Sequence, residues 1–487
     1  MIFNQFKSLF LLTKIKKMRK IVLLITFSIN SLLLSAQINS FDLSTYQLPD
    51  IKRHQLDLAF DLNGSSSVYD RSQRNSMDQF YKRNNIYGDI GLRYNFYSNS
   101  IKYQGNQDIM IDFSSSFNDR KDKESTLYES FDAGSTFRIN SKNRFYFKQK
   151  WFVSTNLHFN GRLYRSTIDQ EVYSAENREN NLTLNIPLGI GVGRIEQVQD
   201  AWLAIYILDE LNKEGRLTRT PTTEEIIEFS QLISQLKNER FFDARLQKIK
   251  EIESVDSFLQ SRNLIKNADA RYFAVVNDNW DHAANRARYS GERMSFHLEP
   301  GYVYTSDFFE DQHESYQLVN EHKITEYSFQ GVLKYMNEKP INRFWQSSFS
   351  FQFAGGYLKA INEDIENGTK VELKAPQLTS SVNYAVGFYP NSRTDLVVSL
   401  GFNYFNSFGE EDINSVKSDI AHFSISPVFS TNLNYYLSPQ LRINANYRLK
   451  YLYLETNSEY YFNMYNDFFQ QKDLNHFINV GFIYQIY

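Results

Sequence analysis

Apolar and polar residues alternate with a period of two along most of the chain, most clearly at its end. Because successive side chains of a β-strand point to opposite faces, such alternation predicts strands with one apolar and one polar face. In residues 474–487 the apolar face holds Ile478, Val480, Phe482, Tyr484 and Ile486. A soluble sheet with one buried face gives the same pattern, so a secreted soluble β protein is the alternative to a membrane β-barrel.

About fourteen such segments can be counted (12–16), an even number as in single-chain bacterial barrels. The sequence therefore predicts an all-β membrane fold, an antiparallel transmembrane β-barrel with a helical insertion. The predicted strands centre on 56–62, 90–96, 109–117, 127–139, 153–163, 182–192, 294–304, 327–335, 345–357, 378–388, 396–404, 423–435, 441–453 and 474–487.

The connections predict an orientation. In outer-membrane barrels the periplasmic turns are short and the external loops are long. Short turns are predicted at 141–143, 390–393 and 437–440, and long polar loops at 306–321, 360–375, 406–419 and 462–473. The two kinds alternate when counted back from the C-terminus, which places that terminus in the periplasm.

Residues 195–289 interrupt the period of two and predict helices. The first helix has an apolar core at helical spacing and ends near Gly215; this core is Val198, Trp202, Ile205 and Leu208. In the second, Thr222 and Glu225 form a capping box ahead of an apolar stripe of Ile226, Phe229, Ile233 and Leu236. A third helix is predicted over 242–259, with Leu246, Ile249 and Ile252 on its apolar side.

This insertion lies between the sixth and seventh predicted strands, on the side of the short turns, so we expect it in the periplasm. Its helices can bury one another's apolar stripes as a small bundle. Residues 265–290 form either a further helix or a segment packed against or inside the barrel mouth. The pattern leaves open whether the bundle plugs the barrel or hangs below it.

The predicted domain organisation begins with an export signal. A basic cluster, the apolar run 21–34 and Ser35-Ala36-Gln37 predict a signal peptide over 1–36, with Met1 or Met18 as its start. Residues 37–53 are a periplasmic lead-in, 54–194 carry strands one to six, 195–289 the insertion and 290–487 strands seven to fourteen. We therefore expect export to the outer membrane of a Gram-negative bacterium.

Composition narrows the function classes. The chain has 40 Phe and 33 Tyr, which suits the aromatic girdles of a barrel. It has no cysteine, which excludes a lipidated N-terminal cysteine, disulfides and thiol chemistry. The net charge of -3 gives no basic footprint for nucleic acid, so no nucleic-acid partner is expected.

Two motifs carry a resemblance to known families. The end of the chain resembles the signal by which outer-membrane barrels are recognised by the barrel-assembly machinery, through Asn479, Gly481, Tyr484, Ile486 and Tyr487. The stretches 193–196, 200–202 and 204–208, directly after a Gly-rich strand, resemble an uncharacterised, porin-like outer-membrane barrel family of Bacteroidetes-type bacteria. The resemblance implies outer-membrane lipid and lipopolysaccharide as surroundings and supplies no chemistry.

Charged residues on the predicted inner faces are the candidate site. The basic ones are Arg442, Arg448 and Lys450 on strand thirteen, and the acidic ones are Asp57, Asp61, Asp89, Asp108 and Asp112 on strands one to three. Closure of a barrel places the last strand beside the first, so we expect the two sets to approach. They form either a salt-bridge network that stiffens the wall or a charge-separated constriction that orients a polar solute.

No catalytic, cofactor or metal site is predicted. His158, His297 and His422 fall on the inner faces of separate strands, and no ligand spacing of a metal site occurs. The expected function is a channel or transporter for small polar solutes. The alternative is a structural or assembly-partner protein that binds a periplasmic protein or peptidoglycan through 195–289.

Overall fold

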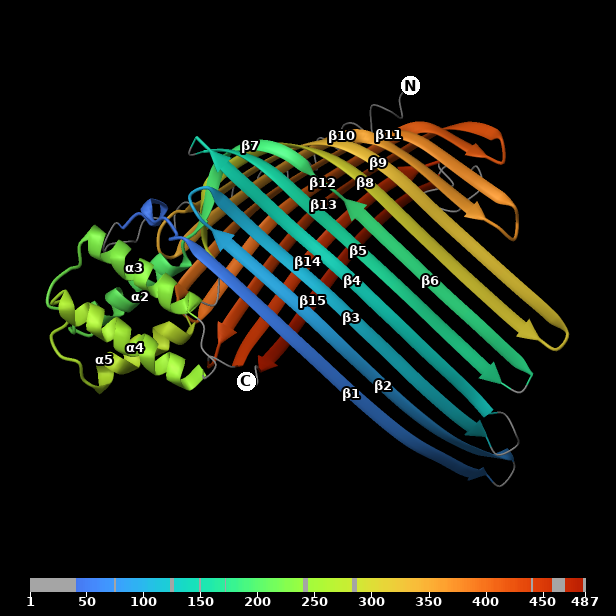
Figure 1. The fold of residues 1–487 in the computed structure, drawn as a ribbon, viewed down its shortest axis with the longest axis horizontal. Helices are drawn as coiled ribbons and strands as arrows, with labels where there is room; N and C mark the ends of the chain where they lie inside the picture. Colours follow the sequence, from blue (N-terminus) through green and yellow to red (C-terminus); the bar gives the residue numbers. More distant parts are fainter. Residues whose placement is uncertain are drawn as a thin grey trace, which may run out of the picture. The chain divides into compact units, whose positions relative to one another are not determined.

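The chain folds into one long antiparallel sheet interrupted by a helical insertion (Figure 1). The computed structural model describes residues 41–73, 76–122, 127–148, 150–170, 172–239, 244–282, 287–438, 441–457 and 469–484. Residues 1–42 form one unit and 43–487 another, and all elements below belong to the second. The predicted signal peptide lies outside the described residues.

The sheet contains fifteen strands in the described residues. They are β1 (Ile51–Gln73), β2 (Ser76–Asn99), β3 (Tyr103–Asp122), β4 (Leu127–Phe147), β5 (Trp151–Gln170), β6 (Tyr173–Asn185), β7 (Leu188–Gln197), β8 (Tyr289–His313), β9 (Tyr316–Pro340), β10 (Trp345–Asp364), β11 (Thr369–Asn391), β12 (Thr394–Ile413), β13 (Val416–Tyr436), β14 (Leu441–Thr456) and β15 (Phe469–Tyr484). The predicted fold class, an antiparallel β-barrel with helices inserted between its strands, is confirmed.

Neighbouring strands in the sheet follow chain order, with β7 paired to both β5 and β8. β6 and β7 together occupy one position, because Asn185 pairs with Gly301 and Leu188 with Leu298 in the same register. Only residues 186–187 separate them. Proline has no N–H to donate to a ladder, so Pro187 interrupts what the sequence predicted as a single strand.

The strands are longer than the alternation predicted, and the prediction of long loops at 306–321, 360–375 and 406–419 is wrong. Residues 314–315, 365–368 and 414–415 form the turns, and the polar residues on either side continue the ladder. Continued pairing satisfies the backbone N–H and C=O groups of these polar segments, so a polar sequence does not end a strand. The fourth predicted loop, 462–473, lies partly outside the described residues, and its last residues belong to β15.

The turn predicted at 141–143 is also wrong, because β4 continues to Phe147 and the chain turns at 148–150. Lys148 has a φ of 49°, in the left-handed region used by tight turns. This turn lies at the same end of the sheet as turns 100–102, 341–344 and 392–393, residues 437–438 after β13 and the end of β15. The helices lie at this end too, and it is called the insertion end below (Figure 1).

A short 3-10 helix, η2 (Leu43–Thr45), precedes β1, and four helices follow β7. They are α2 (Gln199–Lys213), α3 (Thr223–Asn238), α4 (Ala244–Ser261) and α5 (Ala270–His282). Within the described part of the chain, no helix is both long and apolar enough to cross a membrane.

Two predictions for α3 are confirmed, and the apolar side predicted for α4 is wrong. The capping box of Thr222 and Glu225 is present at the start of α3, and the predicted stripe of this helix is buried. On α4, however, Leu246 and Ile249 are about half exposed, whereas Val255 and Leu259 are buried. Glu251 shares the buried face because it accepts a hydrogen bond from the Trp280 indole on α5 at 2.7 Å, so a polar contact selects the face.

Candidate functional site

The two faces of the sheet differ in polarity as the alternation predicted. On β1 the side chains of Leu56, Leu58, Phe60 and Leu62 share one face and are 63–74% exposed. On β15, Ile478, Val480 and Phe482 are 64–71% exposed. The other face of the same strands carries polar residues, and it is called the inner face below because barrel strands point their polar side chains inward.

The five predicted acidic residues lie on the inner face. The registers of β1, β2 and β3 place Asp57, Asp61, Asp89, Asp108 and Asp112 on one side of the sheet. Arg93 lies among them: it is paired across strands with Asp57 and binds Asp108 at 2.9 Å. The acidic group is therefore partly neutralised by a cation of its own strands.

Arg442, Arg448 and Lys450 share the inner face of β14. Arg442 donates to the Tyr436 hydroxyl at 3.3 Å. Beside it runs a chain of amide hydrogen bonds through Asn432, Asn434, Asn444 and Asn446 that reaches Asp395. Within the described residues β1 and β15 are not paired, so the predicted approach of the basic and acidic sets stays a prediction.

The inner face carries a second group of basic residues that was not predicted from the sequence. Lys142 and Arg144 on β4, Arg293 on β8 and Lys334 on β9 lie within electrostatic range of one another. One carboxylate lies among them, Glu299, which accepts a hydrogen bond from Lys334 at 2.5 Å. The same inward alternation would have found these residues, but each strand contributes only one or two, so no single segment looks basic.

Glycines on β7 make room for two buried rings on the inner face. An added Cβ at Gly189 would lie 2.4 Å from the His297 ring, and one at Gly191 would lie 2.3 Å from the Phe152 ring. The two rings therefore lie against bare backbone, and both are buried. At β7 the inner wall is therefore formed by side chains of the neighbouring strands β5 and β8.

The insertion is fastened to the rim through Arg288. This side chain is fully buried and donates to the backbone oxygens of Asn342, Arg343 and Trp345 at 2.8–3.1 Å and to the Gln346 side chain at 3.0 Å. Burial lowers the pKa of its guanidinium to about 10, so it stays charged at neutral pH. Arg288 thus holds the turn between β9 and β10 against the start of β8.

Helix α2 binds the same turn and the end of β11. The Trp202 indole donates to the Arg343 backbone oxygen at 2.7 Å, and the Tyr206 hydroxyl donates to the Tyr389 backbone oxygen at 2.8 Å. Arg343 in turn binds Asp209 of α2 at 2.5 Å. Of the predicted helix core, Val198, Trp202 and Leu208 are buried and Ile205 is half-buried.

Two further links reach other parts of the rim. Arg194, near the end of β7, donates to the backbone oxygens of Ser100 and Ile101 in the turn between β2 and β3, although β4 and β5 lie between these strands in the sheet. The lead-in before β1 contacts β8 and β9 through η2, and the Tyr46 hydroxyl donates to the Ser230 backbone oxygen of α3 at 3.4 Å. The insertion end is therefore crossed by chain segments tied to several separated strands.

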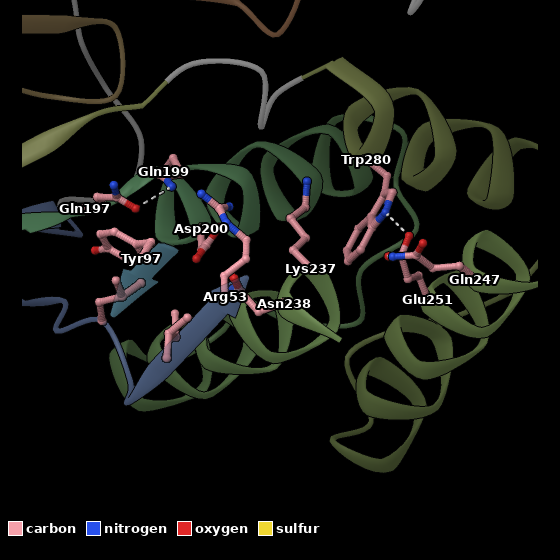
Figure 2. Close-up of a pocket in the computed structure, with 12 residues that line it drawn as sticks. Arg53, Tyr97, Gln197, Gln199, Asp200, Lys237, Asn238, Gln247, Glu251 and Trp280 are labelled. Atoms are coloured by element: carbon pink, nitrogen blue, oxygen red, sulfur yellow. Dashed lines mark hydrogen bonds between the residues drawn. The ribbon is translucent and has the colours of Figure 1, made fainter. Parts of the chain in front are cut away.

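A polar cavity of about 340 Å³ lies between the helices and the first two strands. Figure 2 shows its side chains, which come from β1, β2, the end of β7 and all four helices. Four of them carry charge: Arg53, Asp200, Lys237 and Glu251. No sequence pattern predicts this cavity, because its lining residues are far apart along the chain.

The remaining predicted residues form no chemical centre. His158 contacts Asn140 at 3.0 Å, His297 lies near Glu299 at 3.8 Å, and His422 packs against Phe405. No group of metal ligands occurs among the residues that the structure describes. Of the predicted assembly signal, Asn479 pairs with Asn446 and Gly481 with Asn444, and Tyr484 is the last residue of β15. Ile486 and Tyr487 lie outside the described residues.

Solved structures with a similar arrangement are outer-membrane barrels. The translocator domain of autotransporter NalP from Neisseria meningitidis is 10% identical over 80% of this chain and 90% of that chain, with a TM-score of 0.27. Two TodX monoaromatic hydrocarbon channel mutants, deltaS2S3 and deltaS2, are 11% and 9% identical, each with a TM-score of 0.25. They cover 90% and 92% of this chain and 90% and 93% of their own.

No family model and no curated protein sequence matches the chain. The resemblance to a Bacteroidetes-type barrel family therefore stays a prediction.

Proposed function

We propose that this protein is an outer-membrane β-barrel that conducts small polar solutes through a pore whose periplasmic end is closed by the helical insertion. The apolar outer face suits lipid, and the polar inner face suits water and solute. The fastening of the insertion to the rim carries the proposal. A body tied to the rim at several strands covers an opening, whereas a hanging domain needs only its two chain connections.

Two features of the inner face support polar solutes. Acidic residues gather on β1 to β3, and the basic group of Lys142, Arg144, Arg293 and Lys334 lies on β4, β8 and β9. Charges of opposite sign on different parts of a pore wall orient a dipolar solute as it passes. The charge-separated wall is thus built partly from residues other than those the sequence singled out.

The test is single-channel conductance in planar bilayers, comparing the intact protein with a variant lacking residues 199–287. The Val198 N–H donates to the Arg288 backbone oxygen at 2.8 Å, so the cut ends are adjacent and a short glycine linker can join them. We expect little conductance from the intact protein and steady conductance from the variant. If neither protein conducts, although circular dichroism shows that both are folded, the proposal of a pore is contradicted.

A structural or assembly-partner role is the second candidate. Leu246 and Ile249 on α4 are 50% and 49% exposed on the insertion, which would suit contact with a periplasmic protein. Changing both to Ser would then remove a co-purifying partner without altering conductance. The two roles are distinguishable, because the pore depends on the inner face and the partner role on α4.

A further inference from the structure

The cavity between the insertion and the first two strands has the composition of a ligand site. Three of its lining side chains are buried: Asp200, Glu251 and Trp280 are at most 8% exposed. Among its charged lining residues, Arg53 is the exposed one. A volume of about 340 Å³ is large enough for a small molecule rather than a single water. The lining is mainly polar, which selects a polar occupant.

The two cations of the cavity attract Asp200 across space but are not in direct contact with a carboxylate among the described residues. Arg53 stacks over the Tyr97 ring at 5.8 Å, and the Lys237 ammonium lies over the Trp280 ring at 5.0 Å. Neither forms an ion pair with a residue that the structure describes. In Figure 2, Lys237 lies between Trp280 on one side and Asp200 with Arg53 on the other.

One hydrogen-bond acceptor of the cavity also lacks a donor among the described residues. Glu251 accepts hydrogen bonds from Trp280 and from Gln247, at 2.7 and 3.0 Å. By contrast, the side-chain oxygen of Gln199 is buried and accepts no hydrogen bond from the described residues. Gln199 precedes Asp200 at the start of α2, so an unused acceptor and a buried carboxylate are adjacent in the chain.

Burial makes both buried charges costly. It raises the pKa of the Asp200 carboxyl and lowers the pKa of the Lys237 ammonium, although the two attract each other. A ligand that brings one positive and one negative group would stabilise both. A structural salt bridge would instead place the two side chains in direct contact, as Lys248 and Asp281 do at 2.6 Å in the same helical body.

We propose that this cavity binds a small zwitterion of the amino-acid class. The ammonium group of the ligand lies toward Asp200 and the Gln199 oxygen, and its carboxylate lies toward Arg53 and Lys237. Because its walls come from β1 and β2 as well as from the helices, the bound ligand touches both bodies. It would therefore strengthen the attachment of the insertion to the barrel and favour the closed pore.

The test uses the full chain refolded in detergent micelles. The twenty common amino acids are screened singly by thermal unfolding, and the best is titrated by calorimetry together with its analogues lacking either the amino or the carboxyl group. We expect one or more amino acids to raise the unfolding temperature, and each analogue to bind at least tenfold more weakly. No shift with any amino acid, or equal binding of an analogue, would overturn the proposal.

Variants separate ligand contacts from general charge effects. Lys237→Met and Asp200→Asn should each weaken binding at least tenfold, whereas Lys250→Met and Glu253→Gln on α4 should leave it unchanged. Asp200→Asn is expected to fold at least as stably as the parent, so its loss of binding cannot reflect misfolding. Binding that survives both cavity changes would contradict the assignment. Binding in micelles does not require conduction, so this result and the conductance result are independent.

Discussion

The guanidinium carbon of Arg288 lies 5.0 Å from the centroid of the Trp202 indole ring. The Tyr389 ring lies 4.8 Å from the same carbon, and the two rings meet edge to face with their centroids 5.5 Å apart, so the residue directly before β8, a residue of α2 and a residue of β11 form one cluster. Among the described residues the cation has no carboxylate partner, and it is satisfied by backbone oxygens of the rim. This cluster is the central attachment of the insertion to the barrel.

Loss of this cluster should loosen the insertion without unfolding the sheet. Arg288→Met removes four hydrogen bonds and leaves rim carbonyls without donors, and truncation of a buried hydrogen-bonded charge costs about 2–5 kcal/mol. We expect trypsin to cleave the helices at least tenfold faster in micelles. Arg271→Met, in an exposed pair with Glu214, is the matched control. Equal cleavage of both variants would show that Arg288 does not hold the insertion.

The missed basic group should set ion selectivity. In a conducting background, Arg144→Met with Lys334→Met removes two positive charges from the inner face. In a wet pore, two charges about 8 Å from a passing ion together contribute on the order of 1 kcal/mol, so the anion-to-cation permeability ratio should fall at least about fivefold. The reversal potential in a salt gradient measures this ratio.

The control for selectivity is Lys374→Met. Lys374 alternates with the inward Leu373 and Ala375, so it lies on the opposite face of β11, where it pairs with Glu372 at 2.8 Å. If Lys374→Met lowers the anion-to-cation permeability ratio by the same factor, the selectivity arises outside the inner face.

Acid should destabilise the start of α3. Hydrogen bonds from Arg219 and from the Thr222 backbone lower the pKa of Glu225 to about 2, from an ordinary value of 4.5. A carboxyl with a lowered pKa contributes stability above its ordinary pKa and loses it as the pH falls through the folded value. Helical circular dichroism should therefore decline from pH 4.5 toward 2, and less so in Glu225→Gln.

The capping threonine gives an independent measure of the same helix start. Thr222→Ala should cost about 1 kcal/mol at neutral pH, because one helix N–H loses its side-chain acceptor. An acid profile of Glu225→Gln identical to that of the parent would exclude the capping box as the cause.

Asp200→Asn should stabilise the insertion at neutral pH. Burial raises the pKa of Asp200 above its ordinary 3.8, so the folded state binds this proton more tightly than the unfolded chain. The charged form therefore costs stability at neutral pH. The difference in unfolding temperature should close as the pH falls toward 3.8. A less stable variant at neutral pH would contradict this.

Strand phase could be predicted from the sequence, because lipid and water impose opposite demands on alternating side chains. That constraint fixed the inner positions of Asp57 and Arg442, and the capping box fixed the start of α3. Strand length was not predictable in the same way, since backbone pairing continues through polar segments such as 306–313. The apolar side of α4 was misjudged because the contact of Glu251 with Trp280 selects the buried face.

The sites themselves depend on neighbours that no single segment reveals. Lys142 and Lys334 are brought together by strand order, and Arg53 meets Lys237 only when the insertion docks on β1. Periodicity assigns a face to each residue but gives no distances between elements. The cavity and the basic group are therefore apparent only in the folded structure.

The absence of native cysteine allows the closed state to be trapped chemically. Asp278 of α5 forms an ion pair with Arg393 in the turn between β11 and β12, so cysteines at these two positions can be joined by a short bismaleimide. The single-channel conductance of this double variant, before and after cross-linking and in the Arg288→Met background, tests the central claim most directly. The account predicts frequent opening with Arg288→Met and lasting closure once the cross-link forms. In the Arg288→Met background, unchanged conductance after complete cross-linking would show that the insertion does not close the pore.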